Sequence, residues 1–93
     1  MPTSVIGAVE QELQGERASA LGEAGRRIEA TLAALAEGTD RRGLEVLIDE
    51  AATAIWYFII LRESLRWFDH REALNSYAVP ARVMARVGVV KQR

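Results

Sequence analysis

The stretch Ala54 to Leu61 reads Ala-Ile-Trp-Tyr-Phe-Ile-Ile-Leu, eight apolar or aromatic residues in succession inside a longer helical pattern. A surface helix needs only one apolar stripe, so a run that is apolar on every side must be covered from more than one direction. A run this short could also be a buried strand, because periodicity alone does not separate the two. The helical patterns on both sides of it favour a helix. The organisation of the chain therefore depends on what covers this run.

Two long helices are predicted, over residues 4–37 and 41–68. Ser4 is a favourable N-cap for the first helix, and Gly38 is a favourable stop after it. Thr39 and Asp40 can cap the second helix. In each helix the large apolar residues recur at helical spacing and form one core-facing stripe. The stripes are Leu13, Leu21, Ala24, Ile28, Leu32 and Leu35 in the first helix, and Leu44, Leu47, Ile48, Ala51, Ile55 and Phe58 in the second.

A second, narrower seam of small residues runs along the first helix. Its members are Gly15, Ala18, Gly22 and Gly25. Glycine inside a helix costs roughly 1 kcal/mol relative to alanine, which suggests either a bulky partner that needs close approach or a break in the helix near residues 22–25. If the chain turns near Thr39, residues whose numbers sum to about 78 face one another. This register predicts Gly22 near Trp56 and Ala18 near Ile60.

Two short helices are predicted after the long pair. Asp69 and Glu72 have the spacing of a capping box, which would begin a helix over residues 70–77. The residue before a proline avoids helical geometry, and proline itself suits a first helical turn, so Pro80 predicts a fourth helix that ends at Gly88. Residues 89–93 are expected to be frayed.

The helix lengths predict an antiparallel hairpin in a single domain of 93 residues. The predicted helices would be roughly 50 and 40 Å long, whereas a compact globule of this size is only about 30 Å across. One hairpin buries one side of each helix and leaves other apolar side chains in water. The residues left over, which are the candidates for packing and self-association, are Gly22, Trp56, Tyr57, Ile60 and Leu61. We therefore expect a homodimer with a four-helix core; the alternative is a monomer whose C-terminal helices fold back over the aromatic run.

The charge is unevenly distributed along the chain. Residues 1–61 contain five Lys or Arg and ten Asp or Glu, a net −5, whereas residues 62–93 contain seven and three, a net +4. Such asymmetry is typical of segments that attract one another within a fold or across a dimer, and it also allows a basic binding tail. The chain has no cysteine, no signal-peptide pattern and no apolar run long enough to span a bilayer, so a cytoplasmic location is expected.

The sequence contains no pattern that predicts catalysis, a cofactor or a metal. His70 is the only histidine, which rules out a His-rich metal site, and no glycine-rich phosphate loop follows a strand. His70 is expected to be an exposed helix-start residue. Arg62 continues the buried stripe of the second helix, so it is predicted either to pair inside the bundle with Glu16 or Glu12, or to reach solvent along its aliphatic stem. Neither arrangement implies an enzyme.

One segment allows a different function. Residues 73–87 place apolar side chains roughly as a helix-turn-helix does, and Arg82 and Arg86 would lie on its second helix. Phosphate contacts by these arginines would make the protein a small DNA-binding regulator. Against this, Leu74 stands where a small residue usually lets the two helices cross, and the turn has Ala78 in place of glycine. A plain helical corner that packs on the bundle is favoured.

Several segments together resemble a family of short bacterial helical proteins known only as a domain of unknown function. They are residues 16–22, 26–30, 56–63 and 77–80, with Val83 and Gly88. The family favours glycine at the position of Ala78. The resemblance implies an α-helical bacterial protein without an established activity, and it supplies no site residues.

The sequence thus predicts an all-α protein, a long helical hairpin with two short C-terminal helices, that forms a cytoplasmic homodimer and acts as a structural or protein-interaction module. DNA binding is the alternative, and an enzyme is least favoured. We expect no small-molecule substrate and no membrane contact.

Overall fold

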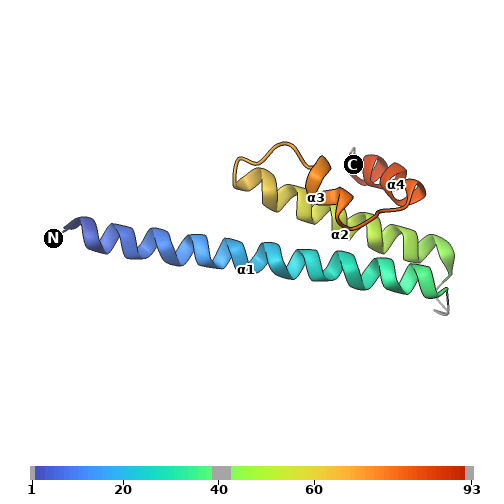
Figure 1. Cartoon of the computed structure of the whole chain (residues 1–93), viewed down its shortest axis with the longest axis horizontal. Coiled ribbons are helices and arrows are strands. Elements are labelled where there is room, and N and C mark those ends of the chain that lie inside the picture. The colour runs from blue at the N-terminus through green and yellow to red at the C-terminus, as the bar shows by residue number, and fades with distance from the viewer. Residues whose placement is uncertain (1, 39–42, 92–93) are drawn as a thin grey trace.

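In the computed structural model, the described part of the chain is all-helical. This part comprises the backbone of residues 2–38 and 43–91 and the side chains of residues 15–38 and 43–88. The elements in order are α1 (Pro2–Glu37), α2 (Leu44–Ser64), α3 (Arg71–Asn75) and α4 (Ala81–Lys91). Helices α1 and α2 pack antiparallel, and α4 lies against α2 on the side away from α1 (Figure 1). The predicted hairpin with two short C-terminal helices is confirmed.

The turn between the long helices is bounded by two glycines with positive φ. Gly38 has φ 62° and donates its N–H to the Ala34 carbonyl at 3.2 Å, which is the left-handed cap that ends many helices. Gly43 has φ 91° and immediately precedes α2. The predicted caps Thr39 and Asp40, and the predicted start of the second helix, lie outside the described residues.

The end of α2 differs from the prediction, because the helix stops four residues before Phe68. The Arg62 carbonyl accepts the N–H groups of both Leu65 at 2.9 Å and Trp67 at 3.0 Å, which tightens and closes the last turn. Arg66 then adopts a left-handed φ of 67° and reverses the chain. Neither glycine nor proline stands at this reversal, so the sequence pattern did not predict the end of the helix there.

The two short helices also differ from the prediction in length. Helix α3 has only five residues, and the Asp69 carboxylate accepts the Arg71 N–H at 3.2 Å just before it. Helix α4 continues through Gly88 to Lys91, so the predicted stop at Gly88 is wrong. Glycine ends a helix where it adopts positive φ, and Gly88 does not do so.

The core is shared by three helices. Ile28 of α1, Ile55 of α2 and Val83 of α4 are fully buried, at 0% exposure each. Ile55 and Phe58 therefore face the core, as the apolar stripe predicted. Because α4 contributes Val83 and Val87 to this core, the C-terminal part does fold back on α2.

The molecule is long for its mass because α1 extends well past α2. Helix α1 has 36 residues and α2 has 21. At 1.5 Å per residue the difference is about 22 Å. Figure 1 shows the N-terminal part of α1 projecting beyond the rest of the chain, and the radius of gyration is 16.2 Å, against about 12 Å for a compact chain of this length. We call residues 2–14 the N-terminal arm.

Candidate interaction surface

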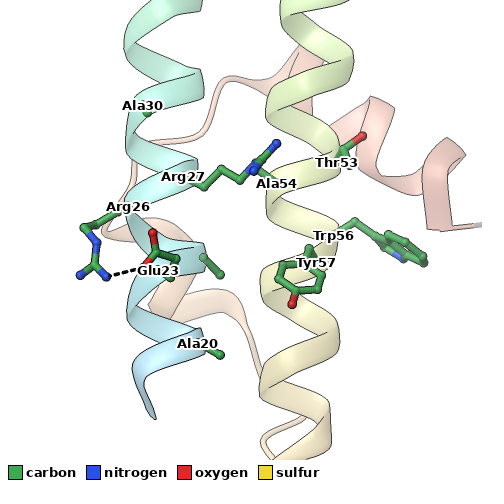
Figure 2. Close-up of a pocket in the computed structure, with 10 residues that line it drawn as sticks. Ala20, Glu23, Arg26, Arg27, Ala30, Thr53, Ala54, Trp56 and Tyr57 are labelled. Carbon is green, nitrogen blue, oxygen red and sulfur yellow. Dashed lines mark hydrogen bonds and ion pairs between the residues drawn. The ribbon is translucent and has the colours of Figure 1, made fainter. Parts of the chain in front are cut away.

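A groove of about 740 Å³ runs along one side of the hairpin between α1 and α2, and we call it the hairpin groove (Figure 2). Its α1 residues are Ala20, Glu23, Ala24, Arg26, Arg27 and Ala30, and its α2 residues are Thr53, Ala54, Trp56 and Tyr57. Both sets recur at helical spacing, because each helix contributes one face to the groove.

The groove is hollow because its floor is made of alanines. Ala24 and Ala54 are buried, at 3% and 2% exposure, and their small side chains leave the space above them open. Their numbers sum to 78, which is the predicted register of the hairpin. Tyr57, 50% exposed, forms a wall on the α2 side, and Arg27 reaches across from α1 (Figure 2).

The charges at the groove are only partly neutralised. Arg26 and Glu23 form an ion pair at 3.1 Å, but both side chains are highly exposed, and such pairs contribute little. Within the described part of the chain, Arg27 forms no ion pair. The α1 side of the groove therefore presents a free guanidinium next to apolar surface.

Gly22 and Trp56 do not pack together as predicted. A Cβ at Gly22 would meet only Arg26 Nη1, at 3.6 Å, and Trp56 projects from α2 on the side away from α1 (Figure 2). The predicted register, in which the numbers of facing residues sum to about 78, agrees with Ala24 and Ala54 lining the same groove. The rotation of α2 about its own axis nevertheless directs the Trp56 side chain away from α1. Of the other predicted packing residues, Ile60 is 39% exposed and Leu61 is half-buried.

The bulky partner of the small-residue seam is instead Tyr77, which contacts Gly25. A Cβ at Gly25 would lie 2.5 Å from Tyr77 Oη and 3.6 Å from its Cζ. The same ring packs edge-on against Phe58, with 5.8 Å between the centroids. Helix α1 is continuous through this point, so the close-approach interpretation holds and the break does not. Tyr77 thereby ties the C-terminal segment to both long helices.

Arg62 does not pair with Glu16. Its Nε donates to His70 Nδ1 at 3.1 Å, and its Nη2 donates to the Asp69 carbonyl at 3.0 Å. Its guanidinium also lies 5.3 Å from the centroid of the Trp67 ring, within cation–π range. Glu16 is exposed on α1, and the alternative partner Glu12 lies outside the described side chains. Arg62 thus stabilises the chain reversal that follows α2.

His70 is a structural part of this reversal and is not the exposed helix-start residue that was expected. Its side chain is only 14% exposed. Because Nδ1 accepts from Arg62, Nε2 carries the proton and faces Glu63 Oε2 at 3.4 Å. This arrangement could not be predicted from the sequence pattern, because it depends on the chain reversal at residue 66.

Arg86 is engaged inside the protein. Its guanidinium donates to Glu45 at 2.6 Å and also to Asp49, both on α2, and the hydrogen bond to Glu45 is the main cause that raises the pKa of Arg86 above its ordinary value. Arg82 is exposed on α4. A basic residue of the tail and acidic residues of the first part therefore pair within one fold. The DNA-binding alternative stays a prediction that no contact here favours.

The described residues contain neither a candidate metal site nor a membrane-spanning helix. Among them, no group of three or more His, Cys, Asp or Glu side chains could hold a metal ion. No helix in that part of the chain is long and apolar enough to cross a membrane.

Comparison with known proteins gives one match. None of the curated proteins and none of the solved structures that were compared resembles the chain significantly. The sequence profile of one family, described as a family of unknown function (DUF6665), matches residues 1–93. This agrees with the resemblance seen in the helix-packing segments, and the chain belongs to this family.

Proposed function

We propose that the protein is a non-enzymatic interaction module of the cytoplasm whose first partner is a second copy of itself. The observation that supports this most is the N-terminal arm, a helical segment that extends past the end of α2 (Figure 1). The sequence of the arm contains Val5, Ile6, Val9 and Leu13. Burying an apolar side chain of this size contributes about 1.5–3 kcal/mol, which the arm forfeits unless another surface covers it.

The hairpin offers apolar surface for such a contact. Tyr57 and Ile60 remain half-exposed on α2 after α4 has packed, and the hairpin groove lies beside Tyr57. Most helical stability in proteins comes from packing of an apolar face, so a partner would stabilise the arm as a helix as well as bury its apolar residues. Both gains favour self-association.

Sedimentation equilibrium over the micromolar range tests this proposal. One chain has a mass of 10.3 kDa, and we expect a species of twice that mass which dissociates on dilution. A mass of 10.3 kDa at every concentration would overturn the proposal.

A further inference from the structure

We infer that the N-terminal arm of one copy docks into the hairpin groove of the other, and that the two copies do so reciprocally. This inference rests on the proposed self-association and specifies its contact. The occupant is one defined segment, residues 2–14 of a second chain, and the receptor is the groove floored by Ala24 and Ala54.

In the sequence, the apolar positions of the arm continue the helical spacing of the groove residues of α1. Positions 5, 9 and 13 of the sequence are apolar and recur every four residues, and positions 20 and 24, both alanine, continue the same line at helical spacing. Ala20 and Ala24 line the groove. A twofold dimer requires a self-complementary surface, in which the same patch of each copy contacts the same patch of the other. An arm and a groove on one face of one helix satisfy that requirement and close the assembly at two copies.

The lengths also match. The α1 side of the groove extends from Ala20 to Ala30, about 15 Å, and an arm of 13 residues is about 20 Å long. If the middle of the arm lies opposite the middle of the groove, the twofold axis passes near position 17 of α1. The two α1 helices then run antiparallel, and each arm lies beside the other copy's hairpin.

The charges are complementary. The segment from residue 2 to residue 16 contains Glu10, Glu12 and Glu16 and no Lys or Arg. The α1 side of the groove carries Arg26 and Arg27, of which Arg27 forms no ion pair within the described chain. Docking brings these carboxylates toward those guanidinium groups. Opposite charges at the rim of an interface favour the correct register and exclude like-charged surfaces.

Paired charge reversal tests the inference on the full-length protein. One variant carries Glu10→Arg with Glu12→Arg, and the other carries Arg26→Glu with Arg27→Glu. Each variant alone sets like charges against each other at both contacts, so we expect its dimer to dissociate at least about tenfold more readily, about 1.4 kcal/mol. An equal mixture restores opposite charges at both contacts, and we expect it to sediment as a 1:1 dimer. Circular dichroism checks that each variant keeps its helices.

Arg82→Glu is the matched control, because Arg82 is exposed on α4 and does not line the groove. It should leave the dimer unchanged. If the two groove-and-arm variants dimerise as the natural chain does, or if their mixture stays monomeric, the inference is overturned while self-association stands. If the natural chain is itself monomeric, the proposed function fails, and the docking fails with it.

Discussion

At the scale of single residues, Ala78 adopts a backbone conformation that its side chain does not favour. Ala78 has φ 51°, a left-handed conformation that costs a non-glycine residue roughly 1–2 kcal/mol. Glycine adopts this conformation without that cost, because it has no Cβ. Alanine thus stands at a turn position before Pro80 whose left-handed backbone conformation favours glycine.

Ala78→Gly should stabilise the protein by roughly 0.5–1 kcal/mol. Glycine removes the strain of the positive φ, and the greater conformational entropy that it gives the unfolded chain offsets part of this gain. Ala85→Gly is the control, since Ala85 is exposed in the middle of α4, where glycine should cost about 1 kcal/mol. Urea unfolding at one fixed protein concentration measures both. Equal destabilisation by the two substitutions would show that Ala78 is not strained.

Asp69 predicts a pH dependence at the same scale. The side-chain hydrogen bond from Arg71 is the main cause that lowers the pKa of Asp69 from 3.8 to about 2. A lowered carboxyl pKa stabilises the folded protein above the unfolded value, and this contribution is lost as pH falls from about 4 through about 2. The group is fully exposed, so the effect on overall stability is small. Carbon-detected NMR should show Asp69 titrating near 2.

Arg71→Gln removes the partner and should return the pKa of Asp69 toward 3.8. If the midpoint of Asp69 does not move in this variant, Arg71 is not the cause of the lowered pKa.

At the scale of elements, the contact of Tyr77 with Gly25 holds the C-terminal segment on the hairpin. Alanine at a helical glycine normally gains about 1 kcal/mol. Gly22→Ala should show this gain, because its Cβ would meet only the flexible end of Arg26. Gly25→Ala should instead destabilise by about 1–2 kcal/mol, because the new methyl would collide with Tyr77 Oη.

The double variant Gly25→Ala with Tyr77→Phe separates the collision from other effects. Without the hydroxyl, the nearest ring atom lies 3.6 Å from the new Cβ, an ordinary contact, so the usual alanine gain should return. The coupling is read from a double-mutant cycle of unfolding free energies. Additive effects would mean that Tyr77 does not lie over Gly25 in solution.

The sequence predicted the long elements well where local chemistry marks their ends. Gly38 adopts the left-handed conformation that its position after α1 suggested. The end of α2 could not be predicted in the same way, because Arg66 has a left-handed φ that its type does not favour. The reversal is held by contacts of Arg62 with residues 69 and 70, which only the folded chain brings together.

The candidate surface was predictable in register but not in detail. A turn near residue 39 was enough to bring positions 24 and 54 level. Which side chain fills the glycine seam depends on the rotation of α2 and on the path of the C-terminal segment. For this reason Tyr77 was missed, and Trp56 was assigned a contact that it does not make.

At the scale of the whole molecule, the elongated shape follows from unequal helices. Helix α4 covers part of α2, but the described chain contains no element beside the N-terminal arm (Figure 1). Arg86 of the basic tail pairs with Glu45 and Asp49 of the acidic first part within one chain. We propose that a second copy of the chain covers both the arm and the hairpin groove.

Distances between spin labels on two copies test this account most directly. The chain has no cysteine, so single labels can be placed through Ala18→Cys, near the predicted twofold axis, and Glu37→Cys, near the hairpin turn; both positions are exposed. Reciprocal docking predicts roughly 25 Å between the two labels at position 18 and about 60 Å at position 37, from helix diameter and rise. A shorter distance at position 37 than at position 18, or no dipolar coupling at either position, would contradict it.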